Sequence, residues 1–204
     1  MRLIGMLDSP YVRRVAISLH WFGLPFAHEP LSVFGDYDAF AAISPVVKAP
    51  TLVTDDGVVL IESSLILAHL ERSADPARRL EPSDLAAHAR NQHLVGIGLA
   101  ACDKAVQIVY ERRLRPAEKQ HEPWVERVTG QLAAACRLID AAAGERDGWL
   151  LDDRPMQADV TAAVAWRFVA EMLPGTIDPA THPAFAALAA RAEALPEFVV
   201  APFG

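Results

Sequence analysis

The sequence predicts an α/β domain over residues 1–78, followed by an all-α domain over residues 84–204. Strand-like and helix-like segments alternate in the first part, whereas the second part contains helix-like segments alone. Between them lies the polar stretch RSADPARRLEPSD, whose prolines Pro76 and Pro82 indicate a linker. We therefore expect the order β-α-β-α-β-β-α in the first domain and a helical bundle in the second.

The first domain begins with an apolar strand over residues 3–6. Pro10 suits the first turn of a helix, apolar residues follow it at helical spacing, and Gly23 ends the helix. Residues 26–30 are expected to form the second strand, and residues 37–42 a short helix.

A hairpin and a third helix complete this domain. Two apolar runs, 49–54 and 58–61, flank Asp55-Asp56-Gly57, and an Asp-Gly pair favours the positive φ of a tight turn. Glu62-Ser63-Ser64 then opens an apolar helix over residues 65–70, and either serine is expected to cap it. Because a helix joins the first two strands and a turn joins the last two, the sheet should be mixed.

Four helices are expected in the second domain. Asp84 caps the first, which runs to about Arg113, and the second extends from residue 121 to Gly144. The third covers residues 159–172 and stops at Pro174-Gly175, and the fourth covers residues 183–194.

Composition and charge argue against several classes of function. The chain has 204 residues, of which 52% are hydrophobic and 22% charged, as in an ordinary globular protein. A formal net charge of -7 argues against nucleic acid as a partner. No apolar run approaches the roughly 20 residues that cross a bilayer, and the N-terminus lacks a signal-peptide pattern. We therefore expect a cytoplasmic protein with no membrane partner.

The cysteines and histidines form no recognisable reactive site. Cys102 and Cys136 lie in Ala-rich helical sequence, without metal-ligand or disulfide spacing, and are interpreted as buried thiols. His88 and His93 are five residues apart, and not the three or four that would place two ligands on one helical face. No metal is expected.

Three short motifs stand in register in the first domain: Ser9-Pro10-Tyr11-Val12-Arg13, Lys48-Ala49-Pro50-Thr51-Leu52 and Glu62-Ser63. In this order and spacing they resemble the thioredoxin-like N-terminal domain of bacterial glutathione S-transferases. The helical second half resembles that family as well, so the resemblance covers nearly the whole chain. It implies a detoxification enzyme, a homodimer, that binds glutathione as co-substrate and activates its thiolate for attack on a small hydrophobic electrophile.

The resemblance assigns five residues to glutathione: Ser9 at its sulfur, and Ala49, Pro50, Glu62 and Ser63 at its peptide. Pro50 is expected to be cis, which leaves the backbone of Ala49 facing outward to pair with the cysteinyl unit. The amide and hydroxyl of Ser63, at a helix N-terminus, would bind the γ-glutamyl carboxylate, and Glu62 would face the adjacent ammonium. From the residues alone, the bond before Pro50 is more often trans, and capping is a sufficient role for Ser63.

Ser9 is the expected catalytic residue. Lowering a thiol pKa by two units needs about 2.7 kcal/mol of preferential stabilisation of the anion. A hydroxyl donor to a charged acceptor contributes roughly 1.5–3 kcal/mol, and a helix N-terminus adds about 0.3–1 kcal/mol. The alternative is that Ser9 only caps the helix, and Tyr11 is a rival donor that we rank second. Because Ser9 and Val12 stand where thioredoxin-like redox enzymes carry cysteines, mechanisms that need a protein thiol are disfavoured.

The electrophile is expected between Ser9 and the long helix that starts near Asp84. Its candidate lining is Tyr11, Cys102, Val106, Tyr110 and Arg113. A packing role is equally open for each residue of that helix.

Two positions depart from the family pattern. Val47 replaces a glycine ahead of Pro50, so the loop backbone is expected to differ, and a role for Lys48 at the glycyl carboxylate of glutathione stays open. Met156 replaces a Ser or Thr at the start of the third helix of the second domain, so Asp159 is interpreted as a structural acceptor without its hydroxyl partner.

Two other functions stay open. One is reduction of a peroxide by the same thiolate, with a second glutathione resolving the product. The other is a non-catalytic protein that keeps the transferase fold for protein–protein contact.

Overall fold

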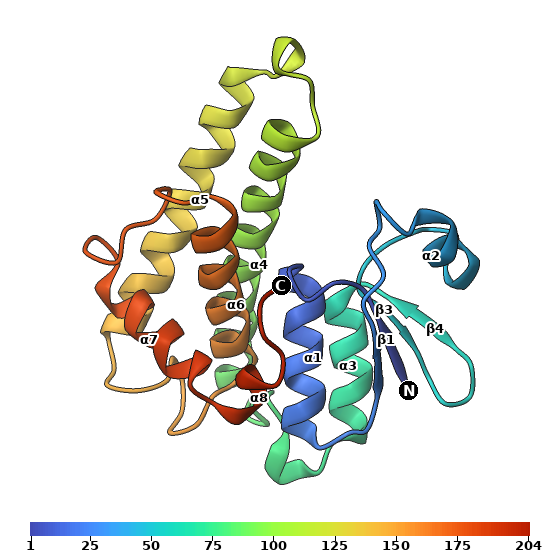
Figure 1. The fold of residues 1–204 in the computed structure, drawn as a ribbon. Coiled ribbons are helices and arrows are strands. Elements are labelled where there is room, and N and C mark those ends of the chain that lie inside the picture. The colour runs from blue at the N-terminus through green and yellow to red at the C-terminus, as the bar shows by residue number, and fades with distance from the viewer. The chain divides into compact units, whose positions relative to one another are not determined.

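A computed structural model describes residues 1–204. The chain divides into two compact units, one formed by Met1–Leu80 with Leu195–Gly204 and the other by Glu81–Ala194 (Figure 1). The division after Leu80 falls inside the predicted linker.

The first unit is built on a four-stranded sheet in the order β2-β1-β3-β4. The strands are β1 (Arg2–Ile4), β2 (Ala27–Glu29), β3 (Thr51–Val53) and β4 (Val59–Ile61). The β1–β2 pair is parallel and the other two pairs are antiparallel, which confirms the expected mixed sheet. Leu3 of β1 lies opposite Leu52 of β3, and both are fully buried.

Three helices complete the predicted order of this unit: α1 (Pro10–Phe22), α2 (Tyr37–Ile43) and α3 (Ser63–Ser73). Gly23 ends α1 with φ 69, a left-handed conformation that glycine adopts without steric cost. Figure 1 shows α1 and α3 side by side, and their apolar residues Val15, Leu19, Ile66 and Leu70 are fully buried.

The last ten residues differ from the predicted domain boundary. Residues 195–204 belong to the first unit and not to the helical one, and they include the short helix α8 (Pro196–Val199). The reason is a buried arginine on α1. Arg13 Nε donates to the carbonyl oxygen of Ala201 at 2.8 Å, and its guanidinium lies 5.5 Å from the centre of the Phe198 ring. These contacts attach the C-terminal segment to α1.

The second unit contains the four predicted helices, α4 (Leu85–Arg113), α5 (Glu122–Gly144), α6 (Gln157–Met172) and α7 (Pro183–Glu193). Short 3₁₀ turns, η1 (Pro76–Arg78) and η2 (Ala117–Lys119), lie in the connections before α4 and α5. Asp84 caps α4 as predicted, since its Oδ1 accepts from Ala87 N at 2.8 Å. Figure 1 shows α4 and α5 as a long antiparallel hairpin, and both α4 and α7 pack against α6.

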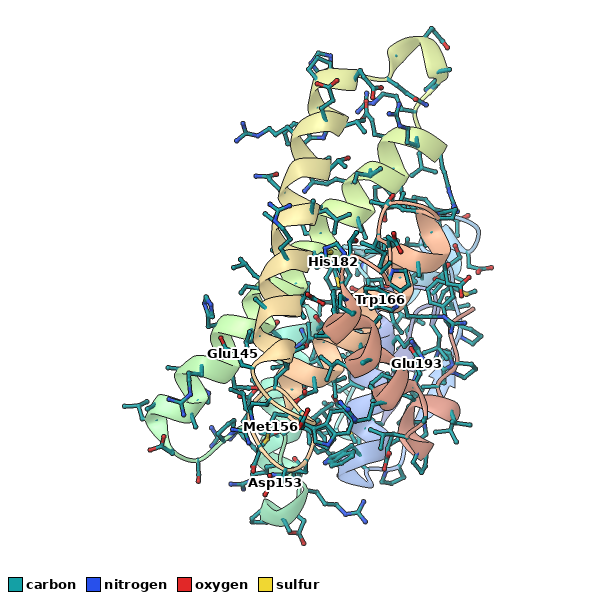
Figure 2. All side chains as sticks on the ribbon, turned by 90° about the vertical axis from the view of Figure 1, so that its left-hand side faces the viewer. Glu145, Asp153, Met156, Trp166, His182 and Glu193 are labelled. Carbon is teal, nitrogen blue, oxygen red and sulfur yellow. The ribbon has the colours of Figure 1, made fainter.

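A buried carboxylate organises the start of α6. Asp159 is fully buried, and its oxygens accept from the backbone N–H groups of Leu150 and Met156, each at 2.8 Å. Figure 2 shows Met156 beside the connection that carries Asp153. Burial raises the pKa of the Asp159 carboxyl to about 6, against the opposing effect of these hydrogen bonds. The structural role expected for Asp159 agrees with this geometry.

Both cysteines are buried free thiols, as predicted, and each is 1% exposed. Burial raises the pKa of the Cys136 thiol to about 11, so it stays protonated at neutral pH. No helix has both the length and the apolar character needed to span a membrane.

Candidate active site

Ser9 occupies the N-cap of α1. Its backbone is extended (φ −72, ψ 122), and its Oγ accepts from Val12 N at 3.5 Å, which is a long hydrogen bond. Capping uses a lone pair of the hydroxyl and leaves its proton, and this proton donates to no acceptor within the chain. The first turn of α1 carries no acidic side chain that would oppose an anion there.

The Ala49–Pro50 peptide bond is cis, the isomer that the resemblance implied. Ala49 is half-buried, and its backbone N–H and C=O take part in no hydrogen bond within the chain. Pro50 is buried. The backbone of Ala49 is therefore unoccupied.

Gly5 brings the Ala49 loop and the first turn of α1 together. Its φ is +134, and a Cβ at this position would lie 2.6 Å from Val12 Cγ2 and 3.1 Å from Ala49 Cβ. Only glycine leaves room for both neighbours, because real Cβ atoms do not approach so closely. Ser9 and Ala49 are thus held at the same end of the sheet.

Val47 adopts φ 49, a left-handed conformation that is unusual for a β-branched residue. The loop thus has the conformation that a glycine would adopt without strain, although a valine stands there. Lys48, the next residue, is exposed, and its carbonyl accepts from Thr51 Oγ1 at 2.8 Å.

Glu62, and not a serine, caps α3, so the expected capping role of Ser63 or Ser64 was wrong. With φ 73, Glu62 folds its carboxylate back onto the helix, where it accepts from Ser64 N at 3.1 Å and Leu65 N at 3.2 Å. A carboxylate at a helix N-terminus is stabilised by the unpaired N–H groups and by the helix dipole. The start of α3 therefore already holds one anion.

The hydroxyl of Ser63 is engaged on the other side by a buried arginine. Arg14 of α1 donates through Nη1 to Ser63 Oγ at 3.2 Å and to Ser64 Oγ at 3.3 Å. Both Arg14 and Ser63 are 1% exposed. The backbone N–H of Ser63 makes no hydrogen bond within the chain.

The residues expected to line the electrophile pocket differ widely in exposure. Tyr11 is half-buried near the start of α1. On α4, Cys102 is 1% exposed, Val106 is half-buried and Tyr110 is 45% exposed. Arg113 donates to the carbonyl oxygen of Met172 at 2.9 Å.

Tyr110 lines a groove of about 620 Å³ within the helical unit. Its other walls are Gln107, Glu111, Leu114, Arg115, Pro116, Lys119 and Trp124. Glu111 pairs there with Arg115 at 2.8 Å, and hydrogen bonds from His121 N and Arg115 lower the pKa of its carboxyl. No cluster of three His, Cys, Asp or Glu side chains is placed to hold a metal ion.

Comparison with known proteins decides the family. The family model described as glutathione S-transferase, N-terminal domain, matches residues 3–78. A maleylacetoacetate isomerase from Pseudomonas aeruginosa is 32% identical over 174 aligned residues, covering 78% of this chain and 77% of that protein. The chain belongs to the glutathione S-transferase family.

Solved structures of glutathione S-transferases share its fold. A glutathione S-transferase from Methylobacterium radiotolerans, in complex with glutathione sulfonate, is 30% identical with a TM-score of 0.91, over 100% of this chain and 95% of that one. A glutathione transferase family member from Pseudomonas fluorescens, with bound S-(propanoic acid)-glutathione, is 26% identical with a TM-score of 0.85, over 98% and 97% of the two chains. These relatives confirm the predicted fold, a thioredoxin-like domain followed by a helical one.

Sequence reasoning missed two residues at the candidate site of this glutathione S-transferase family member. Gly5 carries no chemistry, and only its crowding by Val12 and Ala49 reveals its role. Arg14 was assigned no role at the site from the sequence. Arg14 lies about one turn after Pro10 and one turn before Ile17, both buried, and this spacing was the signal that its charge is buried too.

Proposed function

We propose that this member of the glutathione S-transferase family is a transferase that binds glutathione and uses Ser9 to activate its thiolate. The observation that carries the proposal is the Ser9 hydroxyl, which lies at the N-terminus of α1 with a proton committed to no acceptor. A hydroxyl donor and a helix N-terminus together supply about the 2.7 kcal/mol that a thiol pKa of about 6.5 requires.

The peptide part of glutathione would be held by the backbone of Ala49 and the start of α3. The unoccupied N–H and C=O of Ala49 are suited to pair with the cysteinyl unit as an added strand would. The Ser63 amide and hydroxyl are suited to the γ-glutamyl carboxylate. Glu62 would then face the adjacent ammonium, and an ion pair with it would compensate for any hydrogen bond that its carboxylate gives up at Ser64.

The reaction places charge where Ser9 can meet it. The thiolate attacks an electrophilic carbon, a C–S bond forms, and the leaving group departs with its electron pair. Before attack the negative charge lies on sulfur, where the Ser9 hydroxyl stabilises it by donating a hydrogen bond, so Ser9 need not ionise. During attack this charge moves from sulfur to the leaving group.

A second candidate is isomerisation, which the relative named maleylacetoacetate isomerase favours. A thiolate that adds to an activated double bond places the electron pair on the far carbon. Rotation about the new single bond, followed by loss of the thiolate, returns the isomer and free glutathione. The same Ser9 and Ala49 contacts would serve this reaction, and only the second substrate would differ.

Titration calorimetry with glutathione tests the proposal, with the dipeptide Cys-Gly as the matched ligand that lacks the γ-glutamyl group. We expect glutathione to bind at micromolar to millimolar concentration and Cys-Gly to bind at least about tenfold more weakly, because it offers nothing to the start of α3. No measurable binding at millimolar glutathione would overturn the enzymatic proposal.

A parallel screen separates the reaction classes. Aryl halides and epoxides test transfer, hydroperoxides test the peroxidase alternative, and unsaturated acids with a cis double bond test isomerisation. Glutathione binding without turnover of any of them would favour the non-catalytic alternative. The homodimer stays a prediction, and sedimentation at twice the 22.2 kDa of one chain would support it.

A further inference from the structure

The strongest feature outside the assigned residues is the buried guanidinium of Arg14. It lies on α1 at 1% exposure, within hydrogen-bond distance of two hydroxyls at the start of α3, at 3.2 Å from Ser63 Oγ and 3.3 Å from Ser64 Oγ. A charge this deeply buried is costly unless its donors are occupied. Its place beside the first turn of α3 therefore calls for a specific role.

The direction of these hydrogen bonds fixes the orientation of Ser63. An arginine only donates, so both serine oxygens must accept from it. The proton of the Ser63 hydroxyl is thereby turned away from Arg14, and it points to Glu62 Oε1 at 3.4 Å. Arg14 thus makes Ser63 a donor on the side where Glu62 lies.

The positive charge of Arg14 also favours a second carboxylate at the start of α3. The start of α3 carries the partial positive charge of the helix N-terminus, and it already holds the Glu62 carboxylate. A second carboxylate brought there would repel Glu62 unless a cation lay close by. Arg14 donates to the hydroxyl of Ser63, so its positive charge lies close enough to reduce that repulsion. Because Arg14 is buried, its electrostatic effect is screened less by water.

We propose that Arg14 is a positioning residue for the γ-glutamyl carboxylate: it acts through Ser63, whose hydroxyl it orients as a donor, and through its buried charge. This inference rests on the proposed function, since it assigns the γ-glutamyl group to the start of α3. It concerns recognition of one carboxylate and not the activation of sulfur by Ser9.

Two ligands isolate that carboxylate. Glutathione carries it, and the analogue 4-aminobutyryl-Cys-Gly keeps the ammonium and the rest of the peptide but lacks it. The dissociation constant of the analogue divided by that of glutathione measures the contribution of the carboxylate. A general loss of structure changes both constants together and leaves this ratio unchanged.

The decisive variant is Arg14→Met, measured by calorimetry with both ligands on the full chain. We expect glutathione binding to weaken about 10- to 100-fold and the analogue to bind within about twofold of wild type, because only the charged contact is lost. Arg13→Met is the matched control: it removes a neighbouring buried arginine whose bond goes to Ala201, and it should leave the ratio unchanged. If Arg14→Met leaves the ratio unchanged, whether both ligands bind equally more weakly or neither changes, the inference is overturned.

A second variant covers the case in which Arg14→Met does not fold. Arg14→Lys keeps the charge but replaces the rigid fork of donors, and it should lower the ratio by about three- to tenfold. In the Ser63→Ala background the same Lys substitution should change the ratio less, because the hydroxyl through which Arg14 acts is absent. An equal change in both backgrounds contradicts action through Ser63. Failure of wild-type protein to bind glutathione would instead reject the proposed function itself.

Discussion

Ser9 has two roles open to it, and substitution separates them. Capping and activation use different parts of one hydroxyl, since the lone pair faces Val12 N and the proton is uncommitted. We expect Ser9→Ala to lower turnover about 10- to 100-fold, since it removes one charge-assisted donor, while the dissociation constant of glutathione changes little. Ser9→Thr keeps both functions of the hydroxyl and is the control. The measurement is steady-state kinetics across pH, together with the ultraviolet absorbance of bound thiolate.

If Ser9→Ala turns over at the wild-type rate, Ser9 is a cap and nothing more. The remaining effect would then be a loss of about 1 kcal/mol in the free energy of unfolding. Tyr11 would become the next donor to test.

The raised pKa of Asp159 predicts that the free energy of unfolding depends on pH. Burial raises the pKa of its carboxyl from an ordinary value of 3.8 to about 6. Between these values the folded state binds the proton more tightly than the unfolded state, so this group stabilises the fold at low pH. Its contribution is lost as the pH rises from about 4 to about 6, by about 3 kcal/mol in total.

The measurement is denaturant unfolding at several pH values for wild type and Asp159→Asn. The asparagine does not titrate, so the difference between the two proteins isolates this carboxyl from groups such as Glu111, whose lowered pKa has the opposite effect. We expect the stability of wild type relative to the variant to fall with rising pH across that window. A difference that is flat, or that rises, contradicts the raised pKa.

At the scale of elements, a single glycine sets how closely α4 and α6 pack. A Cβ at Gly98 would lie 2.9 Å from Thr161 Cγ2, which is closer than side chains pack. We expect Gly98→Ala to destabilise the protein by about 1–3 kcal/mol, in spite of the better helix propensity of alanine. Thermal or denaturant unfolding provides the measurement.

Two further variants make this test specific. Gly96→Ala, on the same helix with no atom within 4 Å of its added Cβ, should be neutral or stabilising by up to about 1 kcal/mol. Thr161→Ser removes the crowded methyl but keeps the hydroxyl that donates to Gln157 O, so it should recover most of the loss in Gly98→Ala. No recovery would mean that the crowding lies elsewhere.

At the scale of the whole molecule, the end of the chain stabilises its beginning. Phe198 is 2% exposed and packs against Arg13, so Phe198→Ala should cost about 3–5 kcal/mol. The adjacent Val199, at 63% exposure, is the control, and Val199→Ala should stay within about 0.5 kcal/mol of wild type. Hydrogen exchange locates the effect: Phe198→Ala should raise exchange in α1 more than in α6 and α7. The reverse order would contradict the assignment of residues 195–204 to the first unit.

Sequence patterns predicted the order and type of the strands and of helices α1 to α7, because the signals for these elements are local. Pro10 starts α1, Gly23 stops it, and Asp56-Gly57 turns the hairpin through backbone preferences that act over a few residues. Asp84 capped its helix where the sequence placed it. The motifs around Ser9, Pro50 and Glu62 indicated the family for the same reason, since each is a short run of neighbouring residues.

Contacts between distant residues depend on the packing of the whole fold, and they were not predicted from the sequence. The partners of Arg14 at Ser63 and Ser64 are some fifty positions away in the chain, and that of Arg13 at Ala201 is 188 away. No local preference encodes such pairs. Glu62, and not a neighbouring serine, is the N-cap of α3, because Arg14 donates to both serine hydroxyls and Glu62 adopts a positive φ. Local rules thus predicted the framework and the motifs of the site, whereas burial and long-range hydrogen bonds set the charge and orientation of the groups within it.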